Sequence, residues 1–461
     1  MRSRRRGHLF TTPAPVGEPP AAARTSPGPG SARTLARRAL VALVAVGGCL
    51  GSPLCAADVV TGERLTYAQR VTLPSAILGE SRTLAIALPE SFDAQSERQL
   101  YPVVFVSDVE FFPLVTAVVR HLAAMERMPE SLVVGLEEGV VVPPLFTNGN
   151  RYWPADWNRL RFGASPEPFV RHFREELIPY LRETFRAADY RIIVGVSGSA
   201  GFALHAFCAA PDLFRAYVAF AAGDLLGMGH TEGTSLIEET EACLKKTPGR
   251  RAALFVASPS VDVATDPEIA TRLDTLERRL APYRQSGLRL VSKVFPDEGH
   301  YDMVLPALGE AFELLFPRAE WFVRYRDLLG PPGTPLGPLD AHYARLSSEV
   351  GFPVLPRAER HSSVNSLRRL AWEVDRDGRT EDAIVVIERW IEQRPRSLDA
   401  RLALAAAVET SRGPAAALPF FGQALALARS TAPERAAELE KRVKEMRAIP
   451  PANAANETNE R

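Results

Sequence analysis

Three kinds of residue that can together cleave an ester follow one another along this chain: a serine, an aspartate and a histidine. Nucleophilic catalysis needs a hydroxyl, a base that takes its proton and a carboxylate that orients the base. The serine lies in "RIIVGVSGSAGFALHAF", residues 191–207, where an apolar run gives way to small residues and then to helical spacing. This pattern predicts a strand, a tight turn and a helix, the arrangement that exposes a nucleophile.

Two serines, Ser197 and Ser199, lie in this turn. The pattern expected at a strand-to-helix nucleophile is G-x-S-x-G. Around Ser197 the first glycine is present as Gly195 and the second is replaced by Ser199, whereas around Ser199 the first glycine is missing and Gly201 supplies the second. Ser197 directly follows the strand residues, where the sharp turn must fall, and Ser199 already lies two residues into the helix. The register therefore favours Ser197 as the nucleophile.

The acid and the base are sought after the nucleophile, because the chain order in this class of sheet is serine, acid, histidine. The stretch "ALFVASPSVDVATDPE" predicts a strand followed by a loop with Asp262 and Asp266, and "LRLVSKVFPDEGHYDMV" predicts a strand that leads to His300. Each candidate follows the C-terminal end of a strand, where doubly wound sheets build their sites. His205 lies inside the helix after the turn and His230 in the loop beyond, so His300 is the predicted base.

The elements that must position these residues alternate between strands and helices from about residue 65 to residue 317. Such alternation predicts an α/β fold with a mostly parallel sheet. We assign residues 58–328 to this catalytic domain. The breaker cluster "LGPPGTPLGP" then predicts an inter-domain linker over residues 329–360.

The region 361–447 is predicted to be entirely helical and to contain two helix–turn–helix units. Gly378 and Gly413 hold matching turns, and Ala383 and Ala417 fall where two helices would approach closely. This spacing is typical of tetratricopeptide-like repeats. The large apolar side chains expected to pack within the pair are Trp372, Ile384, Ile387 and Trp390.

The two ends of the chain are predicted to lie outside these domains. Residues 1–35 are rich in Arg, Pro and Gly and are expected to be disordered, as is the polar tail 448–461. Residues 36–57 combine a basic flank, an apolar core and small residues, which predicts a signal peptide cleaved after Ala57. A lipoprotein box ending at Cys49 is the alternative. The mature chain is therefore expected in the periplasm or outside the cell, without a membrane span.

Composition excludes several other classes of function. The formal net charge is zero, with 46% hydrophobic and 24% charged residues, so nothing favours nucleic-acid binding. The chain contains no C-x-x-C pair, no phosphate loop, no dinucleotide fingerprint and no His-Glu-x-x-His, so we expect neither a metal nor a cofactor. Export would allow a disulfide between Cys208 and Cys243, and the sequence leaves open whether they pair.

Several stretches resemble an esterase family of the α/β-hydrolase superfamily, which includes enterochelin esterases, S-formylglutathione hydrolases, feruloyl esterases and mycolyltransferases. The resemblance covers roughly residues 65–430 and rests on "YPVVFVSDVEFF", "FREELIPYLRETFRAADYRIIVGVS" and "VFPDEGHYDMVLPALGEAFELLF". The stretch "LDAHYARLSSEVGF" and the helices after it resemble a subgroup with a C-terminal repeat extension. The resemblance implies an α/β-hydrolase sheet with flanking helices, followed by a small all-α, tetratricopeptide-like domain.

The same resemblance implies roles for individual residues. The family's elbow shares "FALHA" with this chain, which places the nucleophile on Ser197. Aligning "ALFVASPSVD" puts the acid on Asp262, with Asp266 as the second choice. One oxyanion donor is then the amide of Gly198, the residue after the nucleophile, and the second comes from the loop after "VVFVSD", namely Val109 or Glu110.

Two departures from the family bear on function. Ser199 replaces a glycine and is expected to fit with some crowding, so Ser199→Gly would retain or raise activity. The loop "AAGDLLGMGH" replaces the family's "SPSLWW", so the substrate cannot be carried over. The sequence predicts an exported serine esterase that acts on a small or medium ester through an acyl-enzyme. The alternative is a weak or inactive hydrolase-fold scaffold whose helical repeats bind a protein partner or a second copy.

Overall fold

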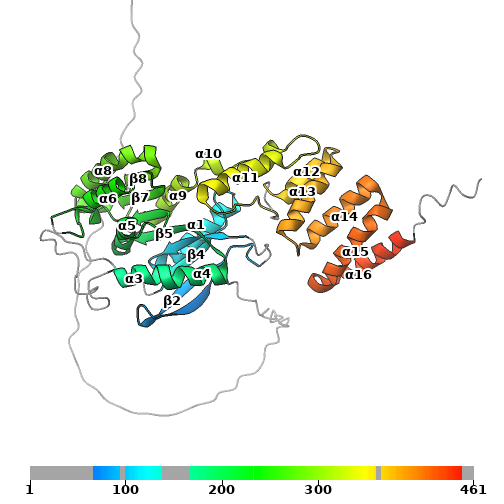
Figure 1. Cartoon of the computed structure of the whole chain (residues 1–461), viewed down its shortest axis with the longest axis horizontal. Coiled ribbons are helices and arrows are strands. Elements are labelled where there is room, and N and C mark those ends of the chain that lie inside the picture. The colour runs from blue at the N-terminus through cyan, green and yellow to red at the C-terminus, as the bar shows by residue number, and fades with distance from the viewer. Residues whose placement is uncertain (1–65, 94–98, 138–165, 232, 360–364, 449–461) are drawn as a thin grey trace, which may run out of the picture. The chain divides into compact units, whose positions relative to one another are not determined.

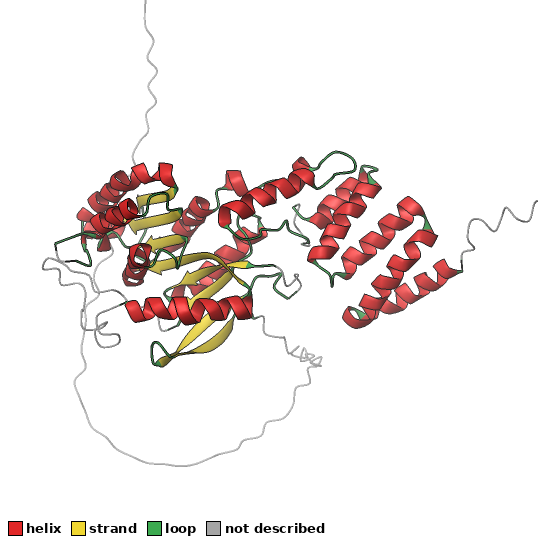
Figure 2. Cartoon of the chain, viewed as in Figure 1, coloured by secondary structure: helices red, strands yellow, loops and turns green. Residues whose placement is uncertain are grey.

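In the part of the chain that the structure describes, one eight-stranded sheet has the strand order β1-β2-β4-β3-β5-β6-β7-β8 (Figures 1 and 2). The strands are β1 (Gln69–Ser75), β2 (Glu80–Ala87), β3 (Tyr101–Val106), β4 (Leu132–Leu136), β5 (Ala187–Val196), β6 (Ala216–Phe220), β7 (Ala252–Pro259) and β8 (Leu288–Phe295). β1 and β2 pair antiparallel and β2 joins β4 antiparallel, while β4, β3, β5, β6, β7 and β8 are mutually parallel. The mostly parallel α/β sheet predicted from the sequence is confirmed.

This computed structural model describes residues 66–93, 99–137, 166–231, 233–359 and 365–448. The predicted disordered N-terminus (1–35), the predicted signal peptide (36–57) and all but the first residue of the predicted tail (448–461) lie outside the described residues.

The central strands are apolar throughout because helices cover both faces of the sheet. In β3, Val104 and Val106 contribute to one core cluster, and Val103 and Phe105 contribute to the other. Successive side chains of a strand point to opposite faces, so a strand buried on both sides becomes a continuous apolar run. This explains why "YPVVFV" shows no alternation of polar and apolar residues.

Two sets of helices cover the two faces. One set packs with the first core cluster: α1 (Phe112–Ala124), α9 (Val304–Leu315) and α10 (Arg318–Trp321). The other packs with the second cluster: α3 (Glu167–His172), α4 (Ile178–Phe185), α5 (Ala200–Ala209), α6 (Leu236–Lys246) and α8 (Glu268–Leu280). The short helix α7 (Ser260–Thr265) follows β7 directly. Among the described residues, no helix is both long enough and apolar enough to cross a membrane.

A helix occupies the middle of the predicted linker 329–360. α11 (Gly337–Val350) buries Leu339 and Leu346, and their neighbours in the first core cluster include residues of the sheet. The breaker cluster does not keep the chain from packing. Pro338 lies in the first helical turn, where no amide donor is needed, and the Thr334 amide closes a turn onto the Pro331 carbonyl at 3.0 Å. Residues 65–461 accordingly form one compact unit.

A buried polar seam ties α11 and the segment after it to the catalytic region. The hydroxyls of Tyr325 and Tyr343 lie 2.8 Å apart, and the Arg357 guanidinium donates to the Ala123 carbonyl at 2.9 Å. Burial raises the pKa of Glu126 to about 8, while the two tyrosine hydroxyls and Arg357 act in the opposite direction. The seam therefore holds a carboxyl group that is largely protonated at neutral pH.

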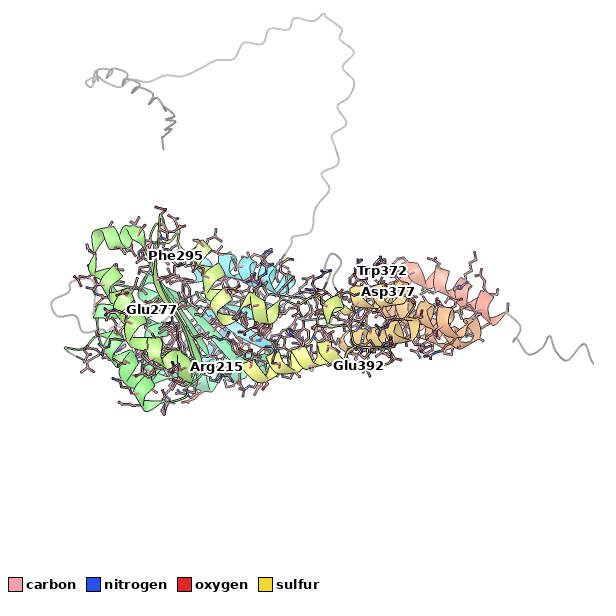
Figure 3. The ribbon with its side chains drawn as sticks, turned by 90° about the horizontal axis from the view of Figure 1, so that it is seen from above. Arg215, Glu277, Phe295, Trp372, Asp377 and Glu392 are labelled. Carbon is pink, nitrogen blue, oxygen red and sulfur yellow. The ribbon has the colours of Figure 1, made fainter. Side chains whose placement is uncertain are left out.

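Five further helices follow α11 within the described residues: α12 (Leu367–Arg376), α13 (Thr380–Gln393), α14 (Leu398–Arg412), α15 (Pro414–Thr431) and α16 (Pro433–Arg447). Each of them packs on the next. Ile384, Ile387 and Trp390 are buried as predicted. The prediction for Trp372 is wrong, since this side chain is 49% exposed (Figure 3). Arg369 and Arg376 lie over its ring at 4.3 and 4.8 Å from the centroid, so cation–π contacts replace the expected packing.

Candidate active site

The sharp turn between β5 and α5 falls on Ser197. Its φ of 52° lies in the left-handed region, which costs a residue with a side chain about 1–3 kcal/mol and persists only where the surroundings impose it. Gly195 shows why the chain is so tight here, because a Cβ at this position would lie 2.6 Å from the Cα of Ala200. Strand and helix therefore meet at Gly195, and Ser197 is the residue that the turn presents.

Ser199 lies inside the fold instead. It is 7% exposed, and its hydroxyl accepts a hydrogen bond from the Val196 amide at 2.9 Å. The single hydroxyl proton is shared between the Asp108 carboxylate at 2.7 Å and the Val196 carbonyl at 3.0 Å. The sequence predicted only that a serine would be tolerated here with some crowding, whereas the hydroxyl has three polar partners.

The contact between Ser199 and Asp108 joins the two turns that carry the predicted oxyanion donors. Asp108 ends the segment after β3 and directly precedes a 3₁₀ turn that begins at Val109, and Gly198 is the middle residue of the turn Ser197–Ser199. The first amides of a helical turn have no partner within it. Val109 is partly buried and Glu110 is exposed, and both amides belong to the turn that follows Asp108.

Two opposing effects act on the pKa of the Asp108 carboxyl group in this contact. Burial raises the pKa of its carboxyl group, and the hydrogen bond from Ser199 acts against that rise. Asp108 was not predicted as a site residue from the sequence. The available signal was an acidic residue directly after an apolar strand. A carboxylate that is partly buried there needs a hydrogen-bond donor.

Asp262 and His300 meet beyond the ends of β7 and β8. The His300 Nδ1 atom lies 2.8 Å from Asp262 Oδ2, and the two side chains are 37% and 18% exposed. A carboxylate on Nδ1 fixes the ring orientation and leaves Nε2 available for a nucleophile. Asp266 has another role: it accepts from the Glu268 amide at 3.1 Å and pairs with Arg272 at 2.9 Å, at the start of α8.

Ser197 and His300 lie at the same edge of the sheet, since each follows the C-terminal end of a parallel strand. The described residues contain no hydrogen bond between Ser197 and His300. Hydrogen bonds of this kind are often long in free hydrolases and tighten when substrate binds. The structure thus brings the predicted acid to the predicted base and places the predicted nucleophile at the same edge.

A second carboxylate, Asp224, lies close enough to this pair to interact with it electrostatically. Burial raises its pKa, the Asp262 charge adds to the rise, and His300 opposes it. Asp224 belongs to the loop after β6 and was not predicted as a site residue from the sequence. An acidic residue shortly after a predicted strand was the available signal.

The other two histidines of this region pair with each other. The Nδ1 atom of His205 lies 3.1 Å from Nε2 of His230, and the Nδ1 atom of His230 lies 2.7 Å from the Glu239 carboxylate. Burial and the neighbouring His230 lower the pKa of His205 to about 4. These contacts commit both rings to a local hydrogen-bonded chain, which leaves His300 as the base candidate.

Cys208 and Cys243 are free thiols on the adjacent helices α5 and α6. The Cys208 thiol donates to the Glu239 carbonyl at 3.7 Å and the Cys243 thiol to the Phe207 carbonyl at 3.9 Å. No group of three or more His, Cys, Asp or Glu side chains in the described parts of the chain is arranged to hold a metal ion.

Comparison with known proteins bears on the fold and on the activity. Residues 75–246 match the model of the family described as "Putative esterase". A search of the curated proteins finds no match. An IroE-like serine hydrolase from Shewanella oneidensis has a TM-score of 0.53 at 20% identity, covering 69% of this chain and 97% of its own. This likeness establishes the fold.

Two further solved structures are more distant. An uncharacterised protein from Capnocytophaga ochracea has a TM-score of 0.47 at 16% identity, covering 83% of this chain and 100% of its own. A siderophore hydrolase from Aspergillus nidulans has a TM-score of 0.43 at 17% identity, covering 57% of this chain and 99% of its own. The fold and the family match together support an esterase of the α/β-hydrolase type. The chain is an ester-hydrolysing enzyme.

Proposed function

We propose that this chain is an exported serine esterase whose catalytic triad is Ser197, His300 and Asp262. The observation that carries the proposal is the 2.8 Å contact between His300 Nδ1 and the Asp262 carboxylate, at the sheet edge where the strained turn presents Ser197. A carboxylate bound to Nδ1 makes Nε2 the basic atom of the ring. A hydroxyl on a sharp turn is accessible to a substrate carbonyl.

The reaction follows from these positions. His300 takes the proton of Ser197 as its Oγ attacks the carbonyl carbon of the ester. The amides of Gly198 and Val109 stabilise the negative charge that develops on the carbonyl oxygen. The C–O bond to the alcohol then breaks, and His300 returns the proton to the leaving oxygen. Water attacks the resulting acyl-enzyme by the same route and regenerates Ser197.

Apolar side chains around the pair suggest the kind of ester. Val261, Tyr301 and Leu305 are 53%, 59% and 58% exposed. Along the chain, Val261 precedes Asp262, Tyr301 follows His300 with the two rings 4.6 Å apart, and Leu305 belongs to the start of α9. The Tyr301 ring lies 5.9 Å from that of Phe111, in the turn that supplies the second oxyanion donor. Exposed apolar groups at a site bind apolar parts of a ligand, so we propose an ester with an apolar acyl or alcohol group.

We further propose that α12–α15 form two tetratricopeptide-like units that bind a protein partner or a second copy. Their turns fall on Gly378 and Gly413, with φ of 78° and 86°. Ala383 and Ala417 are fully buried at matching positions, where a small residue allows two helices to approach. Export to the periplasm or beyond remains our proposal from residues 36–57.

A fluorophosphonate probe tests the proposed nucleophile directly. Wild-type protein should be labelled and should hydrolyse nitrophenyl acetate, and Ser197→Ala should lose both. Ser292→Ala is the matched control, because that hydroxyl only donates to the Leu273 carbonyl at 2.8 Å, and it should keep both. Labelling that persists in Ser197→Ala would contradict the assignment.

A further inference from the structure

A pocket of about 230 Å³ lies at the opposite end of the sheet from the candidate active site. Its wall includes the residues that start β7 and β8, and Arg215, which directly precedes β6. Tyr190 on β5 also lines it and precedes Ser197 by seven residues, which is about 23 Å at the rise of a strand. Figure 3 shows Arg215 and Phe295, the last residue of β8, at opposite ends of the sheet.

The wall of this pocket is strongly basic. It contains four arginines and one carboxylate: Arg215, Arg251, Arg284, Arg289 and Glu349. Arg289 is neutralised by Glu349 and Glu320, and Arg284 by Glu277. In the part of the chain that the structure describes, neither Arg215 nor Arg251 has a side-chain partner.

These two arginines start from neighbouring strands. The Ala253 amide donates to the Arg215 carbonyl at 2.9 Å, and adjacent strands lie about 4.8 Å apart. Arg251 directly precedes β7. Both side chains line the same pocket, and two positive charges on one wall without a counter-charge would attract an anion.

The inner wall of the pocket is aromatic. The Tyr190 ring packs against Phe316 and Phe352, at 5.8 and 6.3 Å between centroids. Burial raises the pKa of Tyr190 to about 12, with Arg289 and Arg215 acting against the rise. The phenol is therefore neutral at physiological pH and keeps its proton as a hydrogen-bond donor. No described residue accepts that proton.

We propose that this pocket is a binding site for a small organic anion, whose carboxylate or phosphate group is held by Arg215 and Arg251. The guanidinium fork matches both head groups because it can donate two parallel hydrogen bonds. The Tyr190 hydroxyl supplies a neutral donor, and Leu315 and Trp321 offer an apolar surface to the rest of the ligand. The site is separate from the ester-hydrolysing centre.

Isothermal titration of the full chain with inorganic phosphate and with benzoate, at one fixed ionic strength, tests the proposal. At least one anion should bind with a dissociation constant of about 1 mM or below. Binding of phosphate alone assigns a phosphoryl head group, and binding of benzoate alone assigns a carboxylate. Arg215→Gln and Arg251→Gln should each weaken binding about tenfold. The control is Arg278→Gln, a 68% exposed arginine outside the pocket that pairs with Asp274, and it should bind like wild type.

Two further measurements keep the test decisive. Tyr190→Phe removes one hydroxyl without changing charge or shape, and it should weaken binding severalfold even if an arginine variant fails to fold. Hydrolysis of uncharged nitrophenyl acetate should be the same in wild type and in Arg215→Gln, because the pocket lies far from Ser197. Failure of both anions to bind at about 10 mM, or equal affinity in wild type and the arginine variants, would overturn the proposal.

Discussion

Replacing Ser199 by alanine tests whether this hydroxyl holds the turn Ser197–Ser199 to the turn that begins at Val109. The change removes one oxygen and keeps the Cβ, so that backbone preference changes little. It deletes the 2.7 Å contact with Asp108 and the 2.9 Å contact with the Val196 amide. A hydrogen bond to a charged group contributes about 1.5–3 kcal/mol, and an orphaned buried donor costs about 1–3 kcal/mol. We expect the free energy of unfolding to fall by about 2–4 kcal/mol.

Urea unfolding followed by tryptophan fluorescence measures this loss. Ser258→Ala is the matched control, because that serine is fully buried but accepts only one hydrogen bond, from the Gly223 amide at 2.8 Å. It should cost about 1 kcal/mol. A double-mutant cycle of Ser199→Ala with Asp108→Ala should show a coupling of about 1–2 kcal/mol, since the two side chains share one contact.

Activity provides the second measurement. A looser junction between the turns misplaces the oxyanion donors relative to Ser197, and a displacement of about 1 Å can cost a hundredfold in rate. We expect kcat for nitrophenyl acetate to fall about ten- to a hundredfold with little change in KM, as befits a residue that positions others. Ser199→Gly should behave in the same way, contrary to what the family's glycine suggests. Stability within about 0.5 kcal/mol of wild type and no coupling to Asp108 would refute the reasoning.

Three other predictions concern the acid, the polar seam and the C-terminal helices. In steady-state kinetics, Asp262→Asn should lower kcat/KM by about a hundredfold or more, while Asp266→Asn should change it less than about threefold. A larger loss in Asp266→Asn than in Asp262→Asn would contradict the assignment of Asp262 as the acid. A carboxyl group with a raised pKa stabilises the fold at low pH, and that contribution is lost as the pH rises from its ordinary pKa towards about 8. At pH 9, Glu126→Gln should therefore unfold at a higher urea concentration than wild type, and at pH 5 the two midpoints should be almost equal. An equal difference between the midpoints at both pH values would count against a buried, titrating Glu126. A chain ending at Gly330 should lose cooperative thermal unfolding, measured by circular dichroism, because α11 contributes to the core. A chain ending at Thr431 keeps α11 but lacks α16, and it should still unfold cooperatively. Normal unfolding of the shorter chain would mean that α11 is dispensable.

Much of the catalytic region was predictable because its signals are local. The apolar runs that became β3, β5 and β7 are buried on both faces, and burial on both faces is what removes polar residues from a strand. The position of Ser197 followed from the strand and helix on either side of it, and Gly195 marks the closest approach of the two. Patterns of this kind depend on residues close together in the sequence, so they can be recognised before the tertiary structure is known.

The C-terminal region shows where local patterns mislead. Prolines and glycines between residues 329 and 338 predicted a linker, because proline interrupts a helix from within. Pro338 instead lies in the first turn of α11, where its ring costs nothing. Trp372 was expected in a core because it is large and apolar, but the arginines one turn before and after it lie over its ring in the folded chain.

The sequence by itself determined the α/β architecture, the sharp turn at Ser197 and the candidates for acid and base, since each depends on neighbours within a few residues. Only the tertiary structure shows that Asp262, and not Asp266, contacts His300, because only folding brings His300, from another strand end, within 2.8 Å of one of them. It alone joined Ser199 to Asp108 across ninety-one positions of the chain, and it alone gathered unpaired arginines around Tyr190. Contacts between distant segments depend on how strands are ordered in the sheet, and no local pattern records that order.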